Sequence, residues 1–155
     1  MRGKTALGVK AMRLSTKGRY AVMAMADLAR SEGGAQRATS LAEIAHRQEI
    51  SLSYLEQLFA RLRRKGLVES ARGPGGGYRL ARSAEDTKIS DIVHAVDEPL
   101  RATRCGQSKG CMTKGERCLT HELWEDLGQH IETYLASVSL ADVINGRLSA
   151  GRQAA

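Results

Sequence analysis

The stretch that decides the fold is Ser40-Leu-Ala-Glu-Ile-Ala-His-Arg-Gln-Glu-Ile-Ser-Leu-Ser-Tyr-Leu-Glu-Gln-Leu-Phe-Ala-Arg-Leu-Arg-Arg-Lys-Gly66. A serine followed three residues later by a glutamate is a capping-box pattern, which predicts the start of a short helix. After a tight connection, Ser51 or Ser53 caps a longer helix that reaches Lys65, and the glycine closes it. A short helix, a brief turn and a longer helix form the helix-turn-helix arrangement.

The longer helix is amphipathic. Four apolar residues from Leu55 to Leu62 share one face, which is the spacing of a helix that packs on a core. Side chains near the N-terminus of a recognition helix reach base edges in the major groove, and cations near its end contact phosphates. The alternative is an ordinary solvated face, because the pattern is common in helical bundles. The opposite face carries Ser53, Tyr54, Glu56, Gln57, Arg61, Arg63 and Arg64.

The next segment favours DNA binding over that alternative. Two short strand candidates, at 67–71 and 78–81, flank the segment Arg72-Gly-Pro-Gly-Gly-Gly77. Its glycines allow positive φ and close approach of the backbone, and Pro74 stiffens its start. A hairpin with a narrow tip and one arginine has the shape of a wing and suits a minor groove. A simple hairpin loop is the alternative, and a phosphate-cradling loop is disfavoured because no Lys-Ser or Lys-Thr pair follows the glycines.

Charge is unevenly distributed along the chain. The 155 residues carry 24 Lys and Arg against 17 Asp and Glu, a net charge of +7. Residues 1–82 hold 16 of these cations and 6 of the anions, a net +10, which leaves 8 cations and 11 anions, a net −3, for residues 83–155. A basic first half suits a polyanion such as double-stranded DNA, although high net charge also serves solubility.

Hydropathy predicts no membrane span. No apolar run approaches the required length, and the stretch from Met1 to Met12 lacks the apolar core of a secretory signal. We therefore expect a cytoplasmic protein with no membrane partner. In that compartment, three cysteines indicate metal or redox chemistry rather than a disulfide scaffold.

The last third of the chain predicts a long amphipathic helix from His121 to Val138, capped by Thr120. A shorter helix, capped by Ser90, precedes it and ends before Pro99. The long helix has little of its own chain to pack against, so we expect it to pair with a second copy in a homodimer. The alternative is that it folds back on the first helix. Its apolar seam for dimerisation is Leu123, Leu127, Ile131 and Tyr134.

All three cysteines lie in Cys105-Gly-Gln-Ser-Lys-Gly-Cys111-Met-Thr-Lys-Gly-Glu-Arg-Cys118-Leu-Thr-His121. This segment is too polar to bury a hydrophobic face, and a metal centre is a plausible way to order it. Thiolates and imidazole suit zinc or iron–sulfur centres. Gaps of five and six residues are wider than the knuckle of a structural zinc site and favour an iron–sulfur cluster, with zinc and redox thiols as alternatives. A cysteine nucleophile is disfavoured because no orienting residue is evident, so we do not expect an enzyme.

The expected fold class is mainly α with a small β-hairpin wing, that is, a winged helix-turn-helix domain plus a long C-terminal dimerisation helix. The expected parts are a flexible N-terminal extension at 1–11, the winged helix-turn-helix DNA-binding domain at 12–99, a cluster-binding loop at 100–121, the dimerisation helix and a final turn at 121–145, and a flexible tail at 146–155.

Four specific motifs occur in order along the chain. They are Met12-Arg-Leu-Ser-Thr-Lys-Gly-Arg-Tyr-Ala-Val22, Ile50-Ser-Leu-Ser-Tyr-Leu-Glu-Gln-Leu-Phe59, Arg72-Gly-Pro-Gly-Gly-Gly-Tyr78 and Cys118-Leu-Thr-His121. Together they resemble the iron–sulfur cluster regulators of the bacterial winged helix-turn-helix repressor family, over about 12–145. One departure is that six residues separate Cys111 from Cys118, where the family pattern usually has five.

The resemblance implies a transcription factor, mainly a repressor, that acts as a homodimer on an operator and controls iron–sulfur cluster assembly genes. A [2Fe–2S] cluster would be held by Cys105, Cys111, Cys118 and His121. A nitric-oxide-sensing sibling, a zinc-stabilised DNA-binding protein without a sensing role and a thiol-redox enzyme are the alternatives. The expected DNA contacts are Ser53, Tyr54, Glu56, Gln57 and the phosphate-binding Arg61 of the recognition helix, and Arg72, Gly73, Gly75 and Gly76 of the wing.

Overall fold

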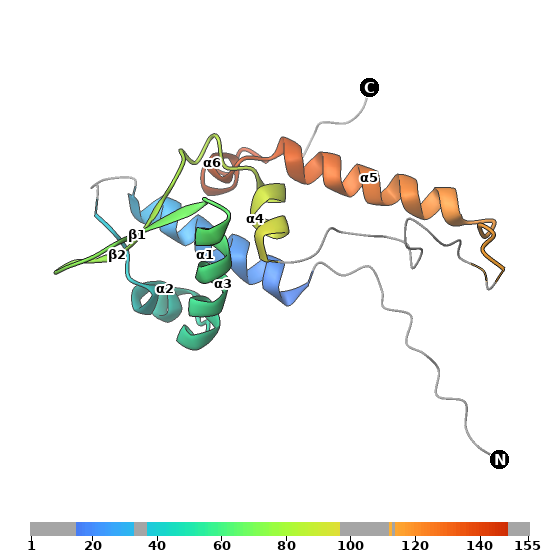
Figure 1. The fold of residues 1–155 in the computed structure, drawn as a ribbon. Helices are drawn as coiled ribbons and strands as arrows, with labels where there is room; N and C mark the ends of the chain where they lie inside the picture. Colours follow the sequence, from blue (N-terminus) through green and yellow to red (C-terminus); the bar gives the residue numbers. More distant parts are fainter. Residues whose placement is uncertain (1–14, 33–36, 97–111, 113, 149–155) are drawn as a thin grey trace, which may run out of the picture.

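The computed structural model of the chain describes residues 15–32, 37–96, 112 and 114–148. It is mainly helical and has one two-stranded antiparallel sheet, which confirms the expected fold class (Figure 1). The predicted extension at 1–11 and most of the tail at 146–155 lie outside the described residues. The elements are α1 (Thr16–Glu32), α2 (Leu41–Gln48), α3 (Leu52–Arg64), β1 (Val68–Ala71), β2 (Gly77–Leu80), α4 (Ile89–Val96), α5 (His121–Ser137) and α6 (Leu140–Ile144).

Local signals set the helix-turn-helix. The Ser40 hydroxyl accepts from the Glu43 N–H at 3.2 Å, and the Glu43 carboxylate accepts from the Ser40 N–H at 2.9 Å, so the predicted capping box is confirmed. Glu49 ends α2 in the left-handed region, with φ of 54°. Ser51 then caps α3, because its hydroxyl accepts from the Tyr54 N–H at 3.4 Å.

The core lies between α1, α3 and α4, and α3 supplies its largest side chain, Phe59. Leu28 of α1 and Val93 of α4 are fully buried in the same cluster. The apolar face predicted for α3 is therefore confirmed. Burying each such side chain contributes about 1.5–3 kcal/mol relative to exposure. The buried residues of α3 are Leu55, Leu58, Phe59 and Leu62.

The hairpin is joined to the helix-turn-helix by a third extended segment. Thr39, just before α2, exchanges two backbone hydrogen bonds with Tyr78 of β2, at 2.9 and 2.7 Å. A Cβ on Gly77 would lie 2.3 Å from the Thr39 carbonyl oxygen, so this close approach requires glycine. The Tyr78 ring also meets the Phe59 ring edge-on, with centroids 5.0 Å apart. The hairpin is thus fastened to both the backbone and the core of the domain.

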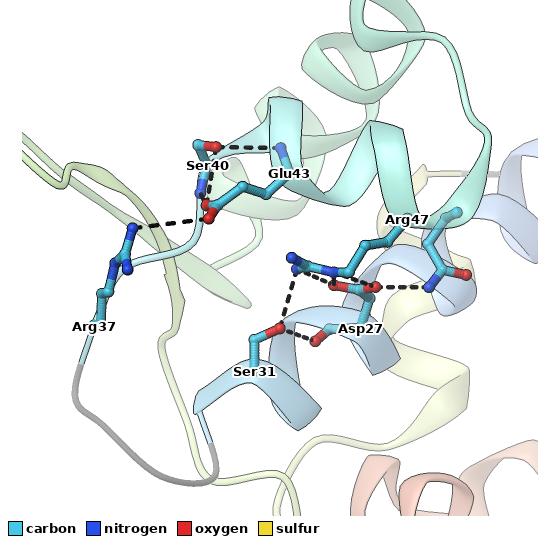
Figure 2. A network of polar contacts seen from close by, with 7 residues as sticks. Asp27, Ser31, Arg37, Ser40, Glu43 and Arg47 are labelled. Carbon is cyan, nitrogen blue, oxygen red and sulfur yellow. Dashed lines mark hydrogen bonds and ion pairs between the residues drawn. The ribbon is translucent and has the colours of Figure 1, made fainter.

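One buried carboxylate ties α1 to α2. Asp27 of α1 accepts from the Arg47 guanidinium at 2.6 and 3.1 Å and from the Gln48 amide at 2.6 Å (Figure 2). The Asp27 side chain is 2% exposed and that of Arg47 is 38% exposed. Burial alone would raise the pKa of Asp27, but the hydrogen bonds from Arg47 and Gln48 and the charges of Arg47 and Arg30 outweigh it, so the pKa is lowered. Sequence patterns did not single out this residue.

We expect Asp27→Ala to destabilise the fold by about 2–3 kcal/mol, between the values typical of exposed and fully buried ion pairs. A lowered folded-state pKa means that the ionised carboxylate stabilises the fold above its unfolded pKa, about 3.9. This contribution is lost as the pH falls through the folded pKa. The difference in free energy of unfolding between wild type and Asp27→Ala should therefore become smaller in acid. Urea unfolding at pH 7 and at about pH 3 measures it, with Glu85→Ala as the exposed-carboxylate control. A difference that widens in acid would contradict the assignment.

The chain after the hairpin returns to the same core. The Ile89 N–H donates to the Val138 carbonyl at 3.0 Å, and the Leu140 N–H donates to the Thr87 carbonyl at 2.8 Å, so the start of α4 and the end of α5 are clasped together. The expectation that Ser90 caps α4 is wrong: α4 begins one residue earlier, and Ser90 is buried within it. The clasp takes the place of a side-chain cap. α5 packs on α4 and projects beyond it, whereas α6 packs on α1 (Figure 1).

Candidate DNA-binding surface and cluster ligands

The outer face of α3 exposes Ser53, Glu56 and Gln57. Tyr54 is half-buried, because its ring packs edge-on against that of Tyr20 with centroids 5.9 Å apart. The start of α3 therefore presents a hydroxyl, a carboxylate and an amide on a rigid helix anchored by Tyr54. These are the groups that distinguish base edges in a major groove.

Arg61 is placed differently from the other cations of α3. Its guanidinium donates to the Val96 carbonyl at 2.7 Å, which satisfies the C-terminal end of α4. Arg61 is still exposed, as are Arg63 and Arg64 of the last turn and the C-cap residue Lys65. The Arg61–Val96 contact was beyond sequence reasoning because 35 residues separate the partners. A phosphate-contacting role of Arg61 stays a prediction.

The tip of the hairpin exposes Arg72 and carries two glycines in the left-handed region, Gly73 at φ 99° and Gly75 at φ 76°. Gly76 has no positive φ, but its N–H donates to the Gly73 carbonyl at 2.8 Å, and a Cβ there would lie 2.7 Å from the Ala71 carbonyl. Gly73 and Gly75 thus provide the positive φ angles of the turn, and Gly76 leaves room for the close approach of the Ala71 carbonyl. The tip is therefore thin, as entry into a narrow groove requires.

Two of the four expected cluster ligands lie in the described residues. The His121 N–H donates to the Cys118 carbonyl at 3.1 Å, so the chain turns between them and both lie at the start of α5. Cys118 is half-buried, and His121 is buried, with its Nε2 3.6 Å from a Glu125 carboxylate oxygen. Cys105 and Cys111 lie outside the described residues, within which no group of three His, Cys, Asp or Glu forms a metal site.

Thr120 occupies the N-cap position of α5, but its hydroxyl makes no capping hydrogen bond, so that expectation is wrong. The hydroxyl oxygen instead accepts from the Trp124 indole N–H at 3.3 Å and lies 3.6 Å from the Cys118 sulfur. Sequence reasoning missed both Thr120 and Trp124 as neighbours of Cys118. Their spacing of four residues was the available signal, since it places both on one helix face.

The seam expected for dimerisation differs in exposure along α5. Leu123 is 59% and Tyr134 57% exposed, whereas Leu127 and Ile131 are partly buried. Trp124 adds a 42% exposed ring beside Leu123. Large apolar side chains in a row on one helix are typical of a surface that meets another protein. No helix in the described part of the chain combines the length and apolarity needed to cross a membrane.

A helix-turn-helix with an exposed second helix, followed by a thin basic hairpin, defines a DNA-binding transcriptional regulator of the winged-helix class. The chain belongs to the Rrf2 family, described as iron-dependent transcriptional regulators, which it matches over residues 14–146. It is 53% identical to HTH-type transcriptional regulators IscR of Photorhabdus laumondii and Xenorhabdus nematophila, over 88% of this chain and 81% of each relative.

Solved structures agree with this assignment. IscR of T. potens is 40% identical, with a TM-score of 0.72, and the match covers 90% of this chain and 91% of that one. CymR, the global cysteine regulator of B. subtilis, is 33% identical, with a TM-score of 0.73 and coverage of 86% and 97%. The family and the curated relatives are described as transcriptional regulators.

Proposed function

We propose that the chain is an iron–sulfur-cluster-sensing regulator, mainly a repressor, of cluster assembly genes. Cys105, Cys111, Cys118 and His121 would hold a [2Fe–2S] cluster. The observation that carries the proposal is the placement of Cys118 and His121 on one turn at the head of α5, in a chain 53% identical to regulators named IscR.

The described ligands fit such a group. Cys118 supplies a half-buried soft thiol and His121 a buried imidazole on one turn, and thiolate with imidazole is a donor set found in iron–sulfur centres. A bound cluster would supply one-electron redox chemistry and sensitivity to oxidants.

In this proposal, three successive segments of the chain have different roles. Residues 12–99 would bind the operator, 100–121 the cluster, and 121–145 a second copy of the chain. The exposed face of α3 would enter the major groove, and Arg72 with Gly73, Gly75 and Gly76 would reach the adjacent minor groove. In a two-fold dimer, two such units would meet two half-sites of a palindromic operator.

Glu56 is expected to act as a discriminator. Its exposed carboxylate repels phosphate but accepts from the amino group of cytosine in the major groove. Glu56→Ala should therefore relax base preference at one position by about 1–3 kcal/mol while keeping or raising general affinity. Gel-shift titrations on operators varied at each position measure this, with Glu69→Ala of β1 as the control for loss of an exposed carboxylate. An equal loss of affinity on all sequences would rule the role out.

The direct test is anaerobic purification, with an absorption spectrum and an analysis of iron, sulfide and zinc, followed by operator binding with and without the cluster. The proposal predicts a coloured protein with two irons and two sulfides per chain and a cluster-dependent gel shift. Zinc in place of iron and sulfide would support a zinc-stabilised DNA-binding protein instead.

A further inference from the structure

We infer that Thr120, oriented by Trp124, is a positioning residue that donates a hydrogen bond to the sulfur of Cys118 and thereby raises the reduction potential of the bound cluster. The inference depends on the proposed cluster function and adds residues to it. It starts from the Thr120 oxygen, which lies 3.3 Å from the Trp124 indole nitrogen and 3.6 Å from the Cys118 sulfur.

The direction of both hydrogen bonds follows from chemistry. An indole N–H can only donate, so Trp124 donates to the Thr120 oxygen. The hydroxyl has one hydrogen, and that hydrogen remains available for the sulfur. A cysteine sulfur that binds metal is a thiolate and has no proton to give. In the cluster-bound protein, the Thr120 hydroxyl is therefore the donor to Cys118.

The hydroxyl of Thr120 does not make the hydrogen bond that is usual for a residue at an N-cap. A threonine at an N-cap normally accepts from a backbone N–H two or three residues later. Thr120 occupies the N-cap of α5 yet makes no such bond. Its backbone, at φ −102° and ψ 6°, lies outside the extended region usual for a capping residue, and its hydroxyl lies near the sulfur and the indole instead.

The expected consequence concerns charge at the sulfur. Reduction adds negative charge to the centre and its thiolate ligands, so a donor aimed at a ligand sulfur stabilises the reduced form. Donation from Trp124 polarises the hydroxyl and strengthens the second bond of the chain. Because Trp124 is 42% exposed, part of this effect is open to solvent competition.

The test compares Thr120→Val with Thr120→Ser and Trp124→Phe in the full-length chain, reconstituted anaerobically. Valine keeps the branched shape without the hydroxyl, and serine keeps the hydroxyl. The midpoint potential is measured by a redox titration followed by visible absorption. At the wild-type midpoint potential, the valine variant should show at least a threefold smaller ratio of reduced to oxidised cluster. This corresponds to a midpoint potential lower by about 30 mV for a one-electron couple. The midpoint potential of Trp124→Phe should fall by a smaller amount, and that of Thr120→Ser should equal the wild-type value.

A second measurement uses the cluster-free chain. Trp124 is the single tryptophan, so one indole N–H signal appears in a ¹⁵N-correlated NMR spectrum. That signal should move in Thr120→Val and stay in place in Thr120→Ser. The melting temperature should change little in the valine variant, because no capping bond is lost and the Trp124–Thr120 hydrogen bond is exposed to solvent.

The outcomes separate the two proposals. If wild type takes up zinc or no metal, the cluster function fails and this inference fails with it. If wild type binds the cluster and the valine variant has the wild-type potential, or serine shifts as far as valine, this inference alone is overturned.

Discussion

Cys118→Ala protein, purified without oxygen, is expected to contain neither iron nor sulfide and to lose its visible absorption completely. Cys118 is one of only three thiols in the chain, so alanine there removes a third of the available sulfur ligands. A [2Fe–2S] cluster needs four ligands, and the remaining two cysteines with His121 supply three. Cys111→Ala should behave in the same way, and both variants should stay dimeric and give only the cluster-free output on DNA.

Met112→Ala is the matched control, because it removes an exposed sulfur side chain from the same segment without removing a thiolate. It should keep the full iron content. His121→Cys should keep a cluster that survives air longer, because an anionic thiolate is a softer and stronger ligand for cluster iron than a neutral imidazole. An unchanged visible spectrum in Cys118→Ala or Cys111→Ala would show that the ligand set is different.

Replacing Leu123 and Tyr134 together by aspartate is expected to give a monomer. Both side chains are more than half exposed in the single chain, so charges there should spare its own packing and act on the contact with a second copy. Without the partner, each recognition helix would bind alone, and operator affinity should fall by about a hundredfold or more, the usual size of a bivalent gain. Analytical ultracentrifugation and gel shifts measure the two effects.

Gln129→Asp is the control for this pair, because Gln129 is exposed on a different side of α5. It should remain dimeric and bind DNA normally. Aspartate at Leu127 and Ile131 should also separate the subunits, but these side chains are partly buried against the chain itself, so loss of folding would complicate the result. A wild-type chain that sediments as a monomer at micromolar concentration would exclude this interface.

The elements that sequence predicted best are those fixed by neighbours a few residues apart. The capping box at Ser40, the cap at Ser51 and the left-handed glycine at Gly66 each depend on one turn of chain, and all three are present. Ser90 and Thr120 carry the same local signal and do not cap. At Ser90, backbone hydrogen bonds to the end of α5 accompany an earlier start of α4. Thr120 has φ −102° and ψ 6°, which is not the extended backbone of a capping residue.

The residues of the candidate site also differ in whether local sequence could predict them. Exposure of Ser53, Glu56 and Gln57 follows from helical periodicity, so sequence was sufficient to place them on the outer face. Asp27 and Arg61 were beyond its reach, because their partners lie 20 and 35 residues away. The sequence around Asp27 does not indicate that the guanidinium of Arg47, from another helix, will neutralise its charge.

The way in which α5 is held has a mechanical consequence. The helix is held at its C-terminal end by the backbone hydrogen bonds to the start of α4. About two thirds of the way along, it is also held by His94, whose Nε2 lies 2.9 Å from a Glu132 oxygen. From Glu132 to His121 it is an arm about 17 Å long, at 1.5 Å per residue. A tilt of one degree at the clamp moves the tip by about 0.3 Å, so a small rotation between α4 and α5 becomes a displacement comparable to thermal motion at the tip. Within the described residues, the segment of α5 from His121 to Glu132 is therefore a lever, and in the proposed dimer contact with a second copy would set its stiffness.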